Sequence, residues 1–260
     1  QKYMETKEQY KDCILFYRLG DFYEMFFDDA LVASKELEIT LTGKSCGLEE
    51  RAPMCGIPYH AVEGYLSKLV SRGYKVAICE QVEDPKLAKG LVKREVIRVV
   101  TPGTNLNVQS LEAGKNNYLL SIAYTPDGIG ISAADVTTGD YYVTEVEDLK
   151  KLNDELMKYE PSEIICNEAF LVSGFDVNDL KSRLHISVNA LESHMFDDDG
   201  CRRILMKHFK VNTLIGLGVE EFPTGLLAAG ALLQYLYDTQ KTDLEHFTHI
   251  YPYLTSKYML

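Results

Sequence analysis

The sequence predicts a protein of the α/β class with two domains, the first of which contains a mixed sheet. A chain of 260 residues is long enough for two separate cores. Strand-like and helix-like segments alternate through the first hundred residues. Three closely spaced strand-like runs, followed by further alternation of helix and strand, predict the second domain.

Hydrophobic periodicity predicts the elements of the first domain, residues 1–103. Residues 1–12 are polar, with aromatic residues at rough helical spacing, and predict a short helix. After Gly20, apolar residues recur every three or four positions, which predicts an amphipathic helix over Asp21–Glu38. The other predicted elements are strands over Cys13–Arg18, Ile39–Thr42, Pro53–Ile57, Tyr74–Val82 and Glu95–Val100 and a helix over Tyr59–Arg72, which Gly73 ends.

Turn residues from Thr101 onward predict a linker over residues 104–116 and a second domain over residues 117–242. The turns Pro126–Gly128 and Thr138–Asp140 separate the first three strands of that domain. Its predicted elements are strands over Tyr118–Tyr124, Ile129–Thr137, Tyr141–Val146, Glu163–Cys166 and Leu184–Val188 and helices over Asp148–Tyr159, Cys201–Phe209 and Thr224–Tyr237. The chain changes character from Asp243, so we expect residues 243–260 to begin a further domain.

Charge is distributed unevenly along the chain. The formal net charge of −12 argues against a general nucleic-acid binder, which is normally basic. Residues 1–115 carry 16 Lys+Arg and 17 Asp+Glu, whereas residues 116–260 carry 11 and 22. If the chain contacts DNA, the first half is therefore expected to do so.

Three further features suggest where the protein resides. No apolar run approaches the roughly 20 residues of a membrane span, so no membrane partner is expected. The six cysteines form no CxxC pair and no Cys/His cluster, which predicts reduced, buried thiols in a cytoplasmic protein. The first residues form no signal peptide and lack an initiator Met, so we expect the chain to begin inside a longer one.

One motif is far more specific than these patterns. The run Phe16-Tyr-Arg-Leu-Gly-Asp-Phe-Tyr-Glu-Met-Phe-Phe27 closely resembles the mismatch-recognition motif of the MutS family of DNA mismatch-repair proteins. The runs Met54–Glu63, Val76–Val82 and Val99–Thr104 follow in the order found in that family. The resemblance covers the first hundred residues well, and continues as an order of elements to about residue 240.

The resemblance implies a role for individual residues of this chain. Phe22 is expected to stack on a mispaired base, and Glu24 to hydrogen-bond to it. Arg18, Leu19, Tyr23 and Arg51 are further candidates for DNA contact. The second domain is expected to be a ribonuclease-H-like connector domain that links DNA sensing to the ATPase of the longer protein.

The resemblance also implies partners and cofactors for the full-length protein. These are mismatched duplex DNA, a second MutS subunit, a MutL-type partner that contacts the connector domain, and ATP with Mg. The sequence contains no GxxxxGK[ST] phosphate loop, so the ATPase is expected outside this chain. We expect no enzymatic activity, metal or cofactor within residues 1–260.

Two alternatives remain open at this point. Phe22 in the first turn of a helix would normally be a core residue, and Asp21-x-x-Glu24 resembles a helix capping box, which would leave an interaction scaffold. Exposure of Phe22 would separate this scaffold from a base-contacting protein. A ribonuclease-H-like fold also makes a metal-dependent nuclease conceivable, with Asp135, Asp140 and Glu163 as the acids.

Overall fold

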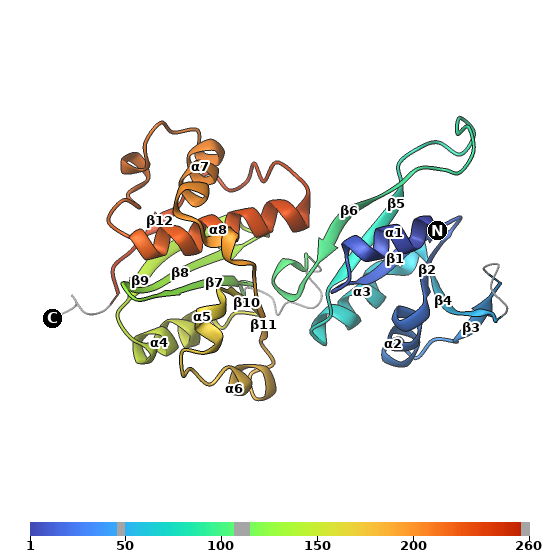
Figure 1. The fold of residues 1–260 in the computed structure, drawn as a ribbon, viewed down its shortest axis with the longest axis horizontal. Coiled ribbons are helices and arrows are strands. Elements are labelled where there is room, and N and C mark those ends of the chain that lie inside the picture. The colour runs from blue at the N-terminus through green and yellow to red at the C-terminus, as the bar shows by residue number, and fades with distance from the viewer. Residues whose placement is uncertain (46–49, 107–114, 256–260) are drawn as a thin grey trace. The chain divides into compact units, whose positions relative to one another are not determined.

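Alternating strands and helices build a six-stranded mixed sheet in each of two units (Figure 1). The computed structural model describes residues 1–45, 50–106 and 115–255. One unit comprises residues 1–110 with 239–241, and the other comprises residues 111–238 with 242–260. The predicted α/β class is confirmed in both. Of the predicted linker 104–116, residues 107–114 lie outside the described part of the chain.

The sheet of the first unit has the strand order β3-β4-β2-β1-β5-β6. Strands β1 and β5 are parallel, and the other neighbours are antiparallel. Helices α2 and α3 supply apolar residues to the core on one face, and α1 packs on the other. The elements are α1 Lys2–Gln9, β1 Ile14–Leu19, β2 Phe22–Phe26, α2 Phe27–Leu37, β3 Thr42–Lys44, β4 Ala52–Pro58, the 3-10 helix Tyr59–Ala61, α3 Val62–Ser71, β5 Val76–Gln81, β6 Arg94–Val100 and the 3-10 helix Pro102–Thr104.

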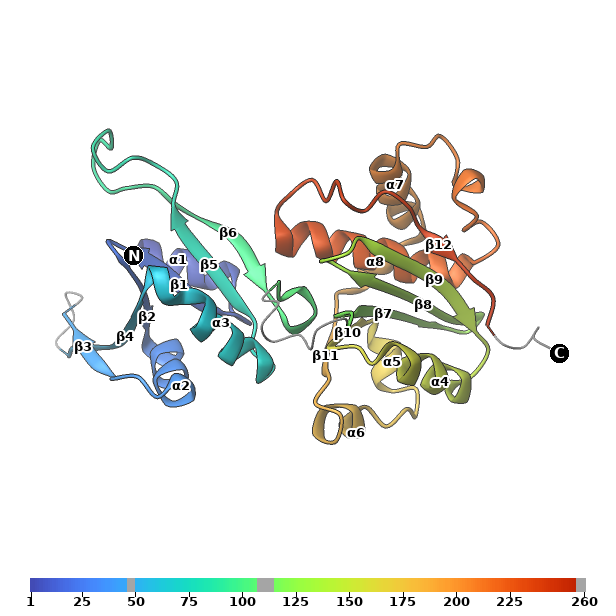
Figure 2. The ribbon, with the colours of Figure 1, turned by 180° about the vertical axis from the view of Figure 1, so that it is seen from behind.

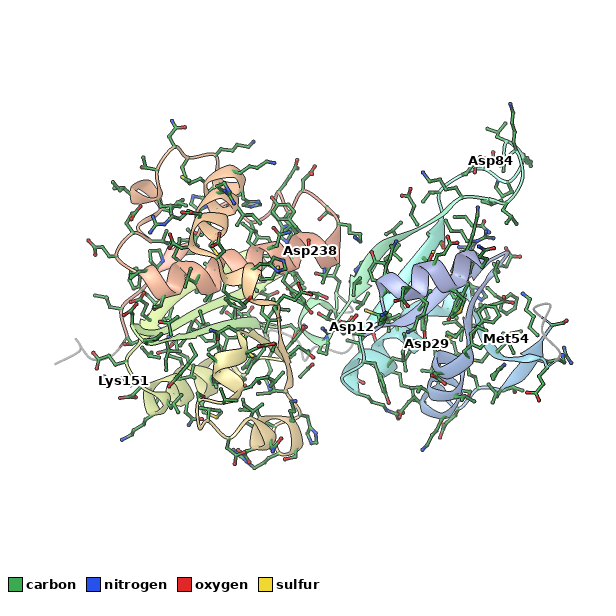
Figure 3. All side chains as sticks on the ribbon, in the orientation of Figure 1. Asp12, Asp29, Met54, Asp84, Lys151 and Asp238 are labelled. Atoms are coloured by element: carbon green, nitrogen blue, oxygen red, sulfur yellow. The ribbon has the colours of Figure 1, made fainter. Side chains whose placement is uncertain are left out.

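A buried carboxylate connects three of these elements. Asp29, in the first turn of α2, accepts a hydrogen bond of 2.9 Å from the backbone N–H of Leu15 in β1. It also forms an ion pair of 2.9 Å with Lys7 of α1. Figure 3 labels Asp29 on α2, and also Asp84, which lies in the loop that extends beyond β5 and β6. Because a buried charge is stable only when paired and hydrogen-bonded, these contacts fix α2 against the sheet.

The predicted helix over Asp21–Glu38 is wrong in its first third. Residues Phe22–Phe26 form strand β2, and the helix begins only at Phe27. Gly20 has a φ of +60° in the two-residue turn that pairs Leu19 with Phe22, and the chain therefore folds back along β1. The spacing of the aromatic residues in this segment fits both a strand, with a period of two, and a helix. The turn at Gly20 determines that the segment forms a strand.

Two shorter elements begin later than predicted. The strand expected over Ile39–Thr42 is Thr42–Lys44, because Glu38 has a left-handed φ of 55° and Ile39 still donates to Ser34 at the end of α2. The strand expected over Leu184–Val188 is β11, Ser187–Ala190, since Ile186 donates back to Leu180 of helix α6, Val177–Ser182. The remaining predicted elements are present, with ends shifted by a few residues.

The second unit contains a three-layer arrangement. Its strand order is β11-β10-β7-β8-β9-β12, with an antiparallel meander of β7, β8 and β9 and parallel pairing from β7 through β10 to β11. Helices α4, α5 and α6 cover one face, and α7 and α8 cover the other (Figure 2). A meander followed by helix–strand alternation is the ribonuclease-H-like arrangement predicted from the sequence. The elements are β7 Leu119–Thr125, β8 Gly128–Asp135, β9 Asp140–Val146, α4 Leu149–Tyr159, β10 Glu163–Cys166, α5 Glu168–Leu171, α6 Val177–Ser182, β11 Ser187–Ala190, the 3-10 helix Ser193–Phe196, α7 Asp198–Phe209, the 3-10 helix Leu214–Leu217, α8 Pro223–Gln240 and β12 Tyr251–Pro252.

Residues 243–255 belong to this second unit rather than beginning a new one. Leu244, Phe247 and Ile250 are buried in the core beneath α8. Strand β12 pairs in parallel with β9 and is the sixth strand of the sheet. The expectation that a further domain begins at residue 243 is therefore wrong for residues 243–255. Their apolar side chains fill the space beside β9.

No helix within residues 1–45, 50–106 and 115–255 is long and apolar enough to cross a membrane.

Candidate nucleic-acid interface

A tight hairpin places Phe22 and Glu24 on the same face of strand β2. Residues two positions apart in a strand point to the same side, and the intervening Tyr23 points to the other. Tyr23 and Met25 are buried in the core with α2 and α3. Phe22 retains 48% of its surface exposure, while the Glu24 side chain retains 17%. The hairpin therefore presents an exposed aromatic ring beside a partly buried acid.

Strand β4 contributes a glycine next to this pair. Phe22 pairs with Pro58 and Glu24 pairs with Gly56 in the antiparallel ladder. A Cβ at Gly56 would lie 3.6 Å from Cγ of Glu24 and 3.9 Å from Cδ1 of Phe22. Any side chain at position 56 would thus lie against both candidate residues. Glycine leaves that flank of Phe22 and Glu24 uncovered.

Glu24 is held by a basic residue on the edge strand β3, which lies on the other side of β4. Its Oε2 lies 3.1 Å from Nζ of Lys44 in β3, and the Lys44 ammonium is 5.5 Å from the ring centroid of Phe26. The carboxylate is therefore oriented from the side of β3 and β4 while it remains next to Phe22. Such a preorganised acid can accept a hydrogen bond from a polar group brought to the hairpin.

Arg18 supports the hairpin from the opposite side. Its Nε donates to the carbonyl of Gly20 at 2.6 Å, and Nη1 forms an ion pair of 2.8 Å with Glu80 of β5. Its guanidinium also lies 3.9 Å from the ring centroid of Tyr59. A carboxylate and an aromatic ring already engage the charge of Arg18. In this structure Arg18 therefore stabilises the turn of the hairpin.

Tyr23 and Leu19 also stabilise this hairpin. The Tyr23 hydroxyl donates to Oε1 of Glu80 at 2.7 Å. Burial, and next the hydrogen bond with Glu80, raise the pKa of Tyr23 well above its ordinary value. Leu19 is partly buried and packs against the smaller core on the α1 side of the sheet. Both residues therefore stiffen the hairpin that carries Phe22.

Arg51 is the one predicted site residue at a distance along the chain from this hairpin. It is exposed and directly precedes β4. Its Cβ would be 3.1 Å from a Cβ added at Gly43 in β3. Arg51 thus lies at the end of β4 that pairs with Lys44, away from the end that pairs with Phe22.

Two of the three acids proposed for a nuclease have separate structural roles in the second unit. Asp135 is fully buried and accepts hydrogen bonds from Thr137 and from the backbone of Asn117. Glu163 is also fully buried and accepts from the Tyr235 hydroxyl at 2.5 Å. Within the described residues, no three His, Cys, Asp or Glu side chains form a group that could hold a metal ion. The nuclease alternative is therefore not favoured.

Sequence reasoning missed the residues that brace the hairpin. Glu80 lies in the run Val76–Val82, which carried the family resemblance, but its contacts with Arg18 and Tyr23 join positions 57 to 62 residues apart. Lys44 was one of several basic residues with no distinguishing pattern. Gly56 had a signal, since an isolated glycine inside a strand indicates a close approach or a missing side chain.

Comparison with known proteins gives consistent matches over the whole chain. The family described as MutS domain I matches residues 1–109, and the family described as MutS domain II matches residues 117–248. A protein of Lachnoclostridium phytofermentans named DNA mismatch repair protein MutS is 66% identical over 260 residues, which is 100% of this chain and 28% of that protein. Proteins of the same name from Ruminiclostridium cellulolyticum and Acetivibrio thermocellus are each 51% identical over 100% of this chain, which is 30% of their length. The chain thus spans less than a third of the length of these relatives.

Proposed function

Because the chain belongs to the MutS family, we propose that its first unit recognises mismatched or looped-out bases in duplex DNA as the starting step of mismatch repair. In this proposal Phe22 stacks on the mispaired base and Glu24 accepts a hydrogen bond from it. The observation that carries the proposal is the 48% exposure of Phe22 on a hairpin whose neighbouring aromatic residues are buried.

An exposed aromatic ring at a rigid turn suits entry into a base step. An apolar side chain that enters from the minor groove unstacks two base pairs and kinks the duplex. Unstacking costs a few kcal/mol, and least where the base is mispaired. The ring therefore discriminates through the deformability of the DNA rather than through a code of base-edge hydrogen bonds.

Glu24 adds discrimination against correct duplex. A carboxylate next to phosphates is repelled, and in the free protein the Lys44 ammonium at 3.1 Å offsets part of this charge. The repulsion is compensated only where an extruded base offers a proton to Glu24. Properly paired bases keep their edges engaged, so they gain nothing from this carboxylate.

The interaction scaffold is the weaker alternative because it requires Phe22 to be a core residue. Tyr23, Met25 and Phe26 of the same strand are buried, whereas Phe22 is not. A large exposed aromatic residue at the start of an otherwise largely buried strand, with a glycine opposite Glu24, is typical of a binding surface rather than of a core.

The remaining partners of the proposal concern the full-length protein. We place ATP and Mg in its ATPase, outside residues 1–260, because this sequence has no phosphate loop. A second copy of the protein would complete the grip on DNA. A MutL-type partner would contact the connector domain, which corresponds to the second unit.

Fluorescence of 2-aminopurine tests the stacking proposal directly. The base is placed next to a single mispair, in a duplex mixed with a full-length MutS protein that carries this sequence. Opening of the base step by Phe22 is expected to raise the fluorescence, and Phe22→Ala is expected to abolish the rise. Leu31→Ala is the control, because Leu31 of α2 is 47% exposed in the same unit. An equal rise with Phe22→Ala would contradict base stacking by Phe22.

A further inference from the structure

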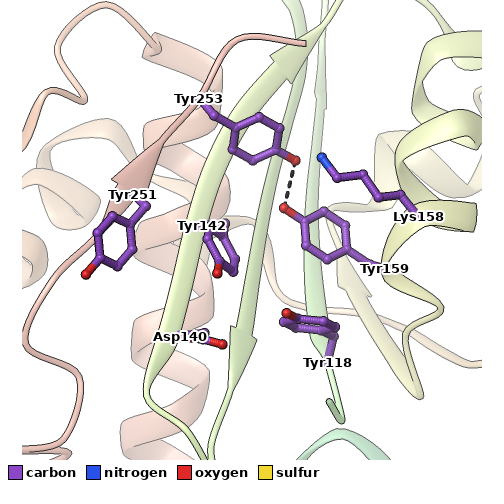
Figure 4. A pocket seen from close by; sticks show the side chains of 7 residues that line it. All are labelled: Tyr118, Asp140, Tyr142, Lys158, Tyr159, Tyr251 and Tyr253. Atoms are coloured by element: carbon purple, nitrogen blue, oxygen red, sulfur yellow. Dashed lines mark hydrogen bonds between the residues drawn. The ribbon is translucent and has the colours of Figure 1, made fainter. Parts of the chain in front are cut away.

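The second unit contains a pocket that the proposed function does not use. It has a volume of about 590 Å³ and is lined by Tyr118, Asp140, Tyr142, Lys158, Tyr159, Tyr251 and Tyr253 (Figure 4). Tyr118 directly precedes β7, and the other residues come from β9, the end of α4, and β12 with the residue that follows it. A volume of this size is in the range of small-ligand sites, which hold roughly 300–1,000 Å³.

The tyrosine rings of the pocket meet edge to face or tilted rather than stacked on one another. The rings of Tyr118 and Tyr159 meet edge to face with centroids 5.1 Å apart. The Tyr142 ring lies 6.5 Å from that of Tyr118 and 6.0 Å from that of Tyr251. The faces of aromatic rings carry negative electrostatic potential, so a cluster of this kind attracts cations.

One end of the pocket already holds a cation. The Lys158 ammonium lies 4.4 Å from the ring centroid of Tyr253 and 5.5 Å from that of Tyr159. It also forms an ion pair of 3.5 Å with Glu155, whose carboxylate accepts from the Tyr253 hydroxyl at 2.6 Å. Tyr159 in turn donates to the Tyr253 hydroxyl at 2.7 Å, as Figure 4 shows. The charged and polar groups at this end are therefore already paired with one another.

The other end carries an acid that is not paired in this way. Asp140, at the start of β9, lines the pocket beside Tyr118 and Tyr142 (Figure 4). Within residues 1–45, 50–106 and 115–255, no hydrogen bond or ion pair reaches the Asp140 carboxylate. Burial raises the pKa of Tyr142, and the Asp140 charge adds to that rise, so this carboxylate acts on the ring beside it.

These observations favour a cationic occupant over an anionic one. A nucleotide or phosphate would find a single basic group in the lining, Lys158, which Glu155 already pairs. It would also approach a half of the chain with 22 acidic and 11 basic residues. A planar guanidinium stacks on aromatic rings and donates two parallel hydrogen bonds to a carboxylate, which an ammonium does not do.

We propose that this tyrosine pocket binds an arginine side chain presented by a protein partner, with the guanidinium stacked between Tyr142 and its neighbours and hydrogen-bonded to Asp140. The second unit would then offer partners a defined anchor point, since arginine in an aromatic pocket is a common centre of binding energy. This binding is independent of Phe22 and of DNA.

The test uses the 260-residue chain and two short peptides. Acetyl-Gly-Arg-Gly-amide is titrated into labelled protein and followed by NMR chemical shifts, next to the same peptide with citrulline, the neutral isostere of arginine. We expect saturable shifts of residues in the pocket with the arginine peptide, and binding weaker by about fivefold or more with citrulline, since cation–π and ion-pair contacts are lost.

Variants locate the binding site. Asp140→Asn should weaken binding of the arginine peptide by about fivefold or more. It should also remove the preference for the arginine peptide over the citrulline peptide. Asp127→Asn, the same change of charge in the exposed turn between β7 and β8, should have no effect. If Asp140→Asn fails to fold, Tyr251→Ala takes its place, because Tyr251 is 50% exposed and its loss should spare the core.

Three outcomes would overturn the proposal. The first is equal binding of the arginine and citrulline peptides, or no saturable binding of either. The second is full binding by folded Asp140→Asn or Tyr251→Ala protein. The third is binding of AMP to the pocket residues in place of the arginine peptide, which would identify a nucleotide site.

Discussion

Phe22 and Phe16 belong to the same motif but differ in what surrounds them. Phe16, in the centre of β1, is fully buried against the rings and aliphatic side chains of the core, with Tyr23 at 6.0 Å. Phe22, directly after the Gly20–Asp21 turn, stands on the opposite face of the hairpin and is 48% exposed. Burial of an aromatic ring stabilises the fold, so only Phe16 contributes its full surface to stability.

This difference predicts opposite effects of truncation on the two residues. Phe16→Ala should lower the free energy of unfolding by about 3–5 kcal/mol, as for other buried Phe→Ala changes. Phe22→Ala should change it by less than about 1 kcal/mol, because surface substitutions have small effects. Urea unfolding of the 260-residue chain measures both. A loss with Phe22→Ala as large as that with Phe16→Ala would show that Phe22 is a core residue.

The Glu24–Lys44 pair leads to a second prediction at this scale. Glu24→Gln removes a negative charge beside the DNA and keeps the shape of the side chain. Binding of matched duplex by the full-length protein should therefore tighten by about fivefold, since two unit charges a few Å apart in water interact by about 1 kcal/mol.

Titration of matched and mismatched duplex at one salt concentration checks this prediction for Glu24. The ratio of the two affinities should narrow, because the mispaired base loses a charged acceptor while matched DNA loses a repulsion. Equal weakening on both duplexes would instead indicate that Glu24 only supports the fold of β2 and β3.

At the scale of elements, helix α8 approaches the sheet of the second unit unusually closely. A Cβ at Gly130 of β8 would lie 1.9 Å from the carbonyl oxygen of Thr224, in the first turn of α8. Glu145 of β9 accepts from the backbone N–H groups of Thr224 and Gly225 at 2.7 and 3.1 Å. The negative charge of Glu145 suits the positive end of the helix dipole, so α8 is docked by its N-terminus.

Gly130→Ala should therefore destabilise the second unit. The added methyl group meets backbone rather than a movable side chain, and such overpacking costs about 1–3 kcal/mol. Gly64→Ala in α3 is the matched control, because nothing lies within 4 Å of a Cβ at that position. That change should stabilise the first unit by about 0.5–1 kcal/mol, the helix preference of Ala over Gly. Thermal unfolding that is unchanged by Gly130→Ala would contradict the close contact.

The elements also show how far the sequence alone can lead. Long segments with one clear period, such as α4 and the β7–β9 meander, were predicted nearly to their ends. Phe22–Phe26 was assigned to a helix because its aromatic residues satisfy both periods, and only the φ of Gly20 at +60° resolves them. Phe22 was predicted as a site residue from the family resemblance rather than from periodicity. The bracing of its hairpin by Arg18, Glu80 and Tyr59 depends on contacts distant in sequence, which no local pattern encodes.

At the scale of the whole chain, charge separates the two halves. Residues 1–115 are nearly neutral, whereas residues 116–260 carry twice as many acidic as basic residues. Affinity for DNA comes largely from neutralised phosphates. Under the proposed function, the hairpin with Phe22 would therefore supply selectivity, and most of the binding energy would come from parts of the full-length protein outside this chain.

Competition binding with a full-length MutS protein carrying this sequence tests the role of Phe22 most directly. The measured quantity is the ratio of affinities for a duplex with one mispair and for the matched duplex, at fixed salt. Phe22→Ala should reduce this ratio by about tenfold or more, because unstacking is worth a few kcal/mol, and Leu31→Ala should leave it unchanged. A ratio that survives Phe22→Ala, in protein as stable as the unaltered one, would contradict recognition of the mispair by Phe22.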